Sequence, residues 1–118
     1  MAKADDIVWF EFVESKIFSK QVGDLPAVLT NIVADLVQNP KRGDIVKGTH
    51  GVRKARVADP SLSRGKSGSY RYLYLYLEHA SRIHLLYLFS KGEQANLSPD
   101  QRRIIAGLSQ QIKGERES

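Results

Sequence analysis

The sequence contains no cysteine. Disulfide bonds, a thiolate nucleophile and cysteine-based zinc sites are therefore excluded, as is usual in a reducing compartment. No apolar run approaches the roughly 20 residues that a membrane-spanning helix needs. The start, MAKADDIVWFEF, lacks the basic region, the long apolar segment and the small-residue cleavage site of a signal peptide. We therefore expect a cytoplasmic protein without a membrane partner.

Motifs for metals and nucleotides are also missing. The sequence has no Walker A loop, no GxGxxG and no HExxH, and its three histidines, His50, His79 and His84, do not have the spacing of metal ligands. No GxSxG surrounds any serine. We expect neither a metal nor a cofactor, and no serine-hydrolase chemistry.

The length and net charge of the chain restrict its domain organisation and its partners. A chain of 118 residues with 42% apolar and 26% charged residues suits one domain with one modest core, spanning 1–118 with frayed ends at about 1–5 and 114–118. A net charge of +5 favours nucleic acid, an anionic membrane surface or an acidic protein as partner. Charge alone does not distinguish between these three kinds of partner.

The first third of the chain predicts one strand and two helices. Residues 7–13 are rich in β-branched and aromatic side chains, which indicates a strand. Apolar residues then recur at three- and four-residue spacing over 15–37, which is typical of a helix with one buried face. Gly23 and Pro26 divide this stretch into two helices, with Asp24 as the predicted cap of the second.

Three further strands and a last helix follow. Residues 52–57 alternate between polar and apolar side chains, and YRYLYLYLE and SRIHLLYLFS read as an antiparallel hairpin around a turn at 78–81. Ser98 and Gln101 form a predicted capping box that opens the last helix. The predicted fold is α+β, in the order β-α-α-β-β-β-α: a small antiparallel sheet with helices packed on one face.

Lys and Arg residues are concentrated between Gly51 and Glu78. Such a stretch is commonly a solvent-exposed loop together with the exposed face of a strand. Here, however, two of the cations are fixed on a strand, and a hairpin brings the others close to them. A phosphate site requires this arrangement. Parity places Arg71 with Leu73 and Leu75 on the expected core face, so we expect a bulge or a twist at the strand end to turn it toward Lys54. The six residues are Arg53, Lys54, Arg56, Arg64, Lys66 and Arg71.

Tyrosines alternate with leucines along the strand that follows. Aromatic side chains at Tyr70, Tyr72, Tyr74 and Tyr76 are favoured on any half-buried strand. They also suit a platform on which bases stack. We favour the first interpretation for the set and predict RNA contact for Tyr70 and Tyr72.

Four segments resemble one family in order. FVESKIFSKQV, NPKRGDIVKGTHGVRKARV, GKSGSYR and SRIHLLYLFSKGEQANLSPDQRR are similar to segments of toxins of the RelE/ParE superfamily, and more narrowly of the HigB-type branch within the RelE group. The resemblance covers roughly residues 11–110. It implies a small antiparallel sheet with two N-terminal helices on it and a C-terminal helix.

The resemblance also implies a function. RelE-group toxins are endoribonucleases that cut mRNA in the translating ribosome, by attack of a ribose 2′-hydroxyl on the adjacent phosphate and without metal. A cognate antitoxin, in this branch one with a helix-turn-helix domain, neutralises them. We therefore expect a monomeric free toxin that forms a hetero-oligomer with its antitoxin.

Site residues follow from the matching positions. The resemblance implies that Lys54 is the general base, that Arg56 and Arg71 hold the phosphate, and that Lys91 is a further phosphate contact or the acid. Arg53, Arg64, Lys66, Tyr70 and Tyr72 complete the expected RNA site. Ser67, Ser69 and Gly92 depart from the family pattern, and we expect these departures to alter substrate context or lower activity.

Two other functions stay open at this point. In the ParE-like reading the same fold inhibits DNA gyrase by binding and cleaves no RNA. In the other, the chain is a non-catalytic basic module that binds nucleic acid or an antitoxin. The basic strand pair and the pattern GVRKAR favour the nuclease over the gyrase inhibitor.

Overall fold

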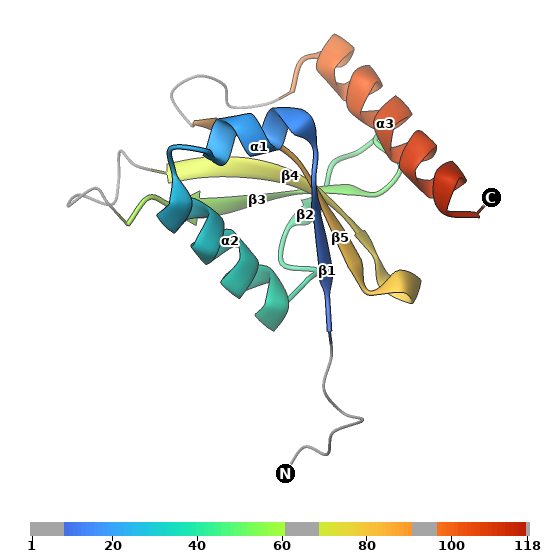
Figure 1. Ribbon diagram of the computed structural model, residues 1–118. Coiled ribbons are helices and arrows are strands. Elements are labelled where there is room, and N and C mark those ends of the chain that lie inside the picture. Colours follow the sequence, from blue (N-terminus) through green and yellow to red (C-terminus); the bar gives the residue numbers. More distant parts are fainter. Residues whose placement is uncertain (1–8, 61–68, 91–96, 118) are drawn as a thin grey trace.

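The computed structural model describes residues 9–60, 69–90 and 97–117 (Figure 1). It confirms the α+β fold and the predicted order, with one short strand added. The elements are β1 (Glu11–Glu14), α1 (Lys16–Val22), α2 (Pro26–Gln38), β2 (Asp44–Ile45), β3 (Val52–Ala58), β4 (Ser69–Leu77), a 3₁₀ turn (Glu78–Ala80), β5 (Arg82–Ser90) and α3 (Pro99–Glu117).

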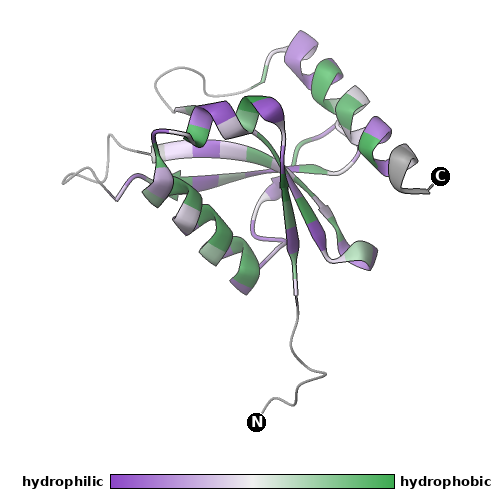
Figure 2. Ribbon diagram, viewed as in Figure 1, coloured by the Kyte–Doolittle hydropathy of each residue, from purple (hydrophilic) through white to green (hydrophobic). Residues whose placement is uncertain are grey.

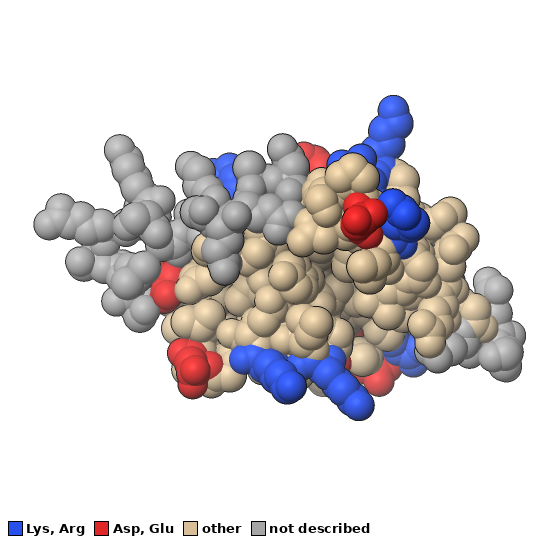
Figure 3. Space-filling model, turned by 90° about the horizontal axis from the view of Figure 1, so that it is seen from above, with Lys and Arg blue, Asp and Glu red and all other residues tan. Residues whose placement is uncertain are grey.

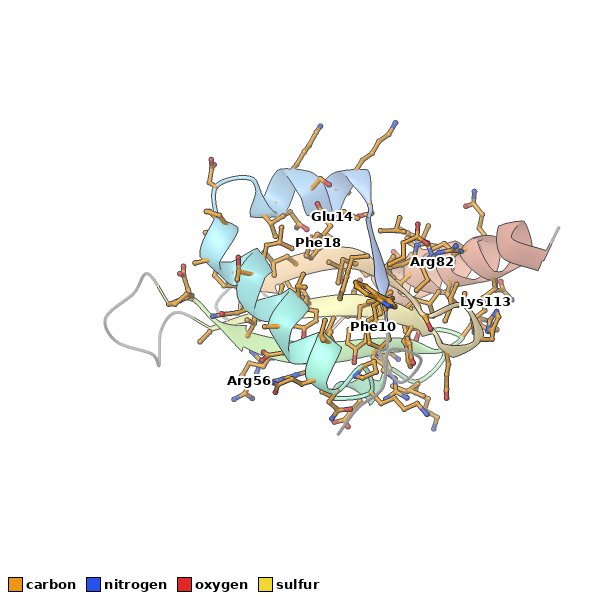
Figure 4. The ribbon with its side chains drawn as sticks, turned by 60° about the horizontal axis from the view of Figure 1, so that its bottom comes forward. Phe10, Glu14, Phe18, Arg56, Arg82 and Lys113 are labelled. Atoms are coloured by element: carbon orange, nitrogen blue, oxygen red, sulfur yellow. The ribbon has the colours of Figure 1, made fainter. Side chains whose placement is uncertain are left out.

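Five strands form one sheet in the order β1-β5-β4-β3-β2. The sheet is not wholly antiparallel as predicted, because β1 pairs with β5 in parallel. Parallel neighbours need a long crossover, and here α1, α2 and the remaining strands separate β1 from β5 along the chain. An ion pair of 2.7 Å between Glu11 and Arg82 joins these two strands at their start. Figure 4 labels Arg82. Of the strand predicted at 7–13, residues 7 and 8 lie outside the described part.

Both faces of the sheet are covered. On one face, α1 and α2 pack over Tyr72, Tyr74 and neighbouring strand residues, and on the opposite face α3 packs over a second core. We predicted all helices on one face. That prediction was wrong because β4 carries large apolar side chains on both faces, tyrosines on one and leucines on the other, and each face must be buried. The second core contains Val52, Leu73, Leu75, Leu77, Leu86, Phe89, Leu97 and Ile105.

Hydropathy changes along the strands as well as across them. The ribbon alternates between hydrophobic and hydrophilic residues, and part of β3 is strongly hydrophilic (Figure 2). Val52 at the start of β3 belongs to the second core, whereas Lys54 and Arg56, two and four residues later, project from the same face. One face of the sheet is thus apolar at one end and cationic at the other.

The helices begin and end as local chemistry dictates. Ser15 caps α1, accepting a hydrogen bond from the Phe18 amide at 3.0 Å. Ser98 and Gln101 form the predicted capping box of α3. The predicted Asp24 cap is not formed: the chain turns through a bond from the Leu25 amide to the Val22 carbonyl, so Leu25 precedes Pro26 as the cap residue.

α3 is fastened to the loop between β2 and β3. The His50 carbonyl accepts hydrogen bonds from the Ser109 hydroxyl at 2.9 Å and from the Lys113 ammonium at 2.6 Å. Lys113 lies on α3, on the far side of the molecule from Arg56 (Figure 4). Gly51 next to His50 has φ near +100°, a conformation that suits glycine.

Candidate active site

A polar hollow of about 410 Å³ lies where β2, β3 and β4 meet. Five of its six lining residues are charged, four of them cations and one an acid. They are Arg42, Asp44, Lys54, Ala55, Arg56 and Arg71. Three of the four residues predicted to be catalytic, Lys54, Arg56 and Arg71, therefore come together.

Strand pairing places these side chains. Arg56 is the direct partner of Arg71, and Lys54 is the direct partner of Asp44 on its other side. Directly opposed residues of antiparallel strands project from the same face with Cβ atoms about 4.5–5.5 Å apart. The hollow is thus built on the backbone of the sheet rather than on a loop.

The bulge expected at Arg71 is not there. β3 and β4 pair in one unbroken register from Val52 with Leu75 to Ala58 with Ser69, and the irregularity in the sheet lies between β4 and β5, at Leu73 and Tyr74. Arg71 shares a face with Leu73 because that face passes from apolar core to polar hollow along its length. No turn of the strand is needed.

Arg71 offers an unused donor. Its Nη1 atom is buried and has no hydrogen-bond partner within the described part of the chain. A buried donor left without a partner costs free energy unless a ligand completes it. Guanidinium nitrogens pair strongly with phosphate oxygens, so the hollow is suited to an anion. Arg56 projects outward from β3, whereas Phe18 lies between α1 and the sheet (Figure 4).

Tyr74 holds the loop that leads into the hollow. Its hydroxyl donates to the Pro40 carbonyl at 2.8 Å and accepts from the Gly43 amide at 3.0 Å. Burial raises the pKa of this hydroxyl, so the fold favours the protonated form that can make both bonds. Arg42 and Asp44 flank Gly43 and are positioned by the same two bonds.

Gly43 permits a close approach to β3. A Cβ atom at this position would lie 2.7 Å from the Lys54 carbonyl oxygen, which is closer than two such atoms can come. Glycine therefore allows β2 to pair with β3 beside Lys54. The glycine of the NPKRGD segment has a structural reason in this contact.

Arg53 lies on the opposite face of β3 and does not reach the hollow. Its guanidinium donates to the Gly43 carbonyl at 2.6 Å and to the Lys41 carbonyl at 3.3 Å. Arg53 thus holds the loop in place from the opposite face of the sheet. An RNA contact by Arg53 would require these bonds to be exchanged.

Arg42 and Asp44 were missed in the sequence. Arg42 forms a 3.3 Å ion pair with Asp35 of α2 and donates to the Arg56 carbonyl at 3.3 Å. Both residues stand in the NPKRGD segment, which we used only for the family resemblance and otherwise read as loop. Its polar residues beside a glycine were the available signal.

The two tyrosines that we predicted to contact RNA differ in their exposure. Tyr70 is half-buried and packs against the core under α1 and α2. Tyr72 is fully buried there, and burial raises the pKa of its hydroxyl, so its ring offers no surface to a base. We leave Tyr72 out of the proposed RNA site. The predicted site residues Arg64, Lys66 and Lys91, and the departures Ser67 and Gly92, lie outside the described residues.

The described residues contain neither a cluster of metal-ligating side chains nor a membrane-spanning helix. Over 9–60, 69–90 and 97–117, no three His, Asp or Glu side chains lie together as a metal site would need. Within the same ranges, no helix is long and apolar enough to cross a membrane.

A second hollow, of about 350 Å³, lies between α1, β5 and α3. It is apolar, and Ile17 and Ile104 at its margins expose 55% and 70% of their surface. Seen from above, the surface over α1 and α3 is mostly uncharged, with Lys and Arg toward its margins (Figure 3). No residue of the polar hollow takes part in it.

The chain is similar to known toxins in both sequence and fold. Residues 18–118, which include every residue lining the polar hollow, match the model of a family described as the RelE toxin of the RelE/RelB toxin-antitoxin system. The chain belongs to the RelE toxin family. A solved structure of a mutant of the E. coli toxin RelE in the free state is similar over 73% of this chain and 87% of that chain, with 10% identity and a TM-score of 0.53. At that identity it supports the RelE fold alone.

Proposed function

We propose that this RelE-family chain is a toxin that cleaves mRNA in the translating ribosome, without metal, and so inhibits translation in the cytoplasm. The observation that carries the proposal is the polar hollow, in which Lys54, Arg56 and Arg71 project from paired strands of one sheet face. A sheet holds such groups in fixed positions, as catalysis by preorganised charge requires.

The charges of the hollow suit phosphate cleavage. When a 2′-hydroxyl attacks the adjacent phosphate, negative charge grows on the phosphorus oxygens, and fixed cations stabilise it. Arg71 with its unpartnered Nη1 and Arg56 beside it are the proposed phosphate ligands. Lys54, two residues before Arg56 on the same face of β3, adds a third positive charge.

The hollow has the size of a small-ligand pocket and so admits a small part of an RNA strand, such as one phosphate and its ribose. Small-molecule pockets typically enclose about 300–1,000 Å³, and the hollow falls within this range. Bases must be unstacked to enter such a site, and single-stranded RNA allows this. An mRNA held open within a ribosome meets that condition.

Mapping of transcript ends tests the proposal. We would induce the protein briefly in cells and map mRNA 5′ ends, beside a variant that carries Lys54→Ala and Arg71→Ala. New ends inside translated codons that vanish in the variant support the nuclease. Growth arrest with intact transcripts and a DNA-damage response points to ParE-like gyrase inhibition, and no arrest at all points to a non-catalytic binding module.

We also propose that a helix-turn-helix antitoxin binds the toxin and that the free toxin is a monomer. Family membership supports an antitoxin partner. Co-expression with a helix-turn-helix protein encoded next to the toxin should restore growth and yield a complex that co-purifies. Light scattering of the isolated, inactive variant should give the mass of one chain.

A further inference from the structure

The polar hollow contains one carboxylate among four cations, and we propose that this group, Asp44, rather than the Lys54 amine, accepts the proton of the attacking 2′-hydroxyl. The inference rests on the proposed nuclease function and assigns one role within it. The hollow is otherwise cationic, with Arg42, Lys54, Arg56 and Arg71 around the carboxylate.

Position is the first argument. Asp44 is the direct strand partner of Lys54, so its side chain projects from the same face, toward the site where the arginines would hold a phosphate. The backbone on its N-terminal side is fixed by the Tyr74 hydroxyl and by the contact of Gly43 with Lys54. A base held this way keeps its place when substrate enters.

The lack of a structural role is the second argument. Within the described residues, the Asp44 side chain makes no hydrogen bond and no ion pair, whereas Asp35 of α2 pairs with Arg42 at 3.3 Å. A carboxylate also weakens the attraction of a cationic hollow for phosphate. Neither folding nor anion binding accounts for an acid at this point.

Proton affinity is the third argument. Ammonium and guanidinium groups ordinarily carry their protons at neutral pH, whereas a carboxyl group has ordinarily lost its proton. A general base must be in its unprotonated form when the substrate arrives. Asp44 supplies the one carboxylate that lines the hollow.

The step balances without a metal or a redox partner. The 2′-hydroxyl proton passes to the Asp44 carboxylate while a bond forms between the 2′-oxygen and phosphorus. The bond from phosphorus to the 5′-oxygen breaks, and that oxygen takes a proton from water. The products are a 2′,3′-cyclic phosphate and a 5′-hydroxyl end. Asp44 then returns its proton to solvent, and Arg56, Arg71 and Lys54 stabilise the charge on phosphorus.

Single-turnover cleavage of a defined mRNA in purified, programmed ribosomes separates the two candidates. Asp44→Asn should slow cleavage by about 10²–10⁴-fold, the usual contribution of a general base. Asp44→Glu should recover part of the loss. Lys54→Arg keeps the charge but provides no base, so it should slow cleavage by about tenfold or less. Asp24→Asn makes the same chemical change at an exposed site between α1 and α2 and serves as the matched control.

Binding and folding complete the test. Asp44→Asn should bind the ribosome at least as tightly as the unsubstituted protein and melt at the same temperature. Full activity of Asp44→Asn overturns the inference, as does loss of cleavage in Lys54→Arg, or an Asp44→Asn defect that follows weaker binding or a lower melting temperature. If the unsubstituted protein does not cleave, the proposed function fails, and the inference with it.

Discussion

Arg56 and Arg71 lie directly opposite each other on β3 and β4, projecting from the same face of the sheet. Like charges in this relationship destabilise a sheet, by roughly 0.2–1 kcal/mol for such a pair. A fold gains nothing from it, and proteins tolerate such costs where function needs them. An anion bound between the two guanidinium groups would offset this cost, which accords with the proposed phosphate site.

Replacing Arg56 by Gln should separate stability from activity. The change removes the repulsion across the strands, so the free energy of unfolding should stay equal or rise by up to about 1 kcal/mol. Phosphate binding should weaken because one cation is lost. Urea unfolding and cleavage in programmed ribosomes measure the two effects, and a clear loss of stability would contradict the view of the pair as a cost.

Tyr74 and its neighbour Tyr72 form a matched pair for a hydroxyl deletion. Tyr74→Phe removes the bonds to Pro40 and Gly43 and leaves both groups unsatisfied, which should lower the free energy of unfolding by about 1–3 kcal/mol. The Tyr72 hydroxyl has no hydrogen-bond partner among the described residues, so Tyr72→Phe should be neutral or stabilising. Equal losses in the two variants, measured by urea unfolding, would contradict the role given to Tyr74.

Gly43 and Gly107 should respond oppositely to alanine. At Gly43 the new Cβ atom meets the Lys54 carbonyl at 2.7 Å, so β2 must move and both stability and cleavage should fall. Gly107 lies in α3 with nothing within 4 Å of a new Cβ atom, so Gly107→Ala should stabilise by up to about 1 kcal/mol through helix propensity. Thermal unfolding of both variants and cleavage by each provide the check.

Alkaline pH should destabilise the fold through the two buried tyrosines. Burial raises the pKa of Tyr72 and of Tyr74 above the ordinary value near 10. The unfolded chain loses these protons first, so the stability they contribute is complete below about pH 10 and is lost as pH rises from there toward the folded values. Urea midpoints measured between pH 8 and 11 should fall at the alkaline end, and less steeply in Tyr72→Phe. An identical slope in that variant would contradict the assignment.

Periodicity predicted most elements because their signals are local. The apolar repeat over 15–37, the alternation of 52–57 and the capping box at Ser98 each depend on neighbours in sequence, and all three appear. The parallel pairing of β1 and the place of α3 depend on contacts between distant segments. A single strand pattern does not reveal whether both of its faces will be covered.

Local sequence patterns likewise predicted only part of the polar hollow. Lys54 and Arg56 share parity on one strand, and Arg71 begins the next, so their convergence followed from a hairpin. Arg53 has the opposite parity, and a strict period of two would have placed it behind the sheet, where it braces the Gly43 loop. Asp44 enters the hollow only through the pairing of β2 with β3. The charged residues beside Gly43 mark the segment, but no pattern within it indicates which strand it pairs with.

The two outer strands of the sheet are much shorter than its inner strands. β1 has four residues and β2 has two, whereas β4 and β5 have nine each and carry the most apolar sequence. Aggregation of β proteins proceeds by edge-to-edge addition of further strands, and long, exposed apolar edges promote it. Because the two edge strands are this short, the folded toxin presents little template for fibre growth, and concentrated solutions should remain clear for as long as the protein stays folded.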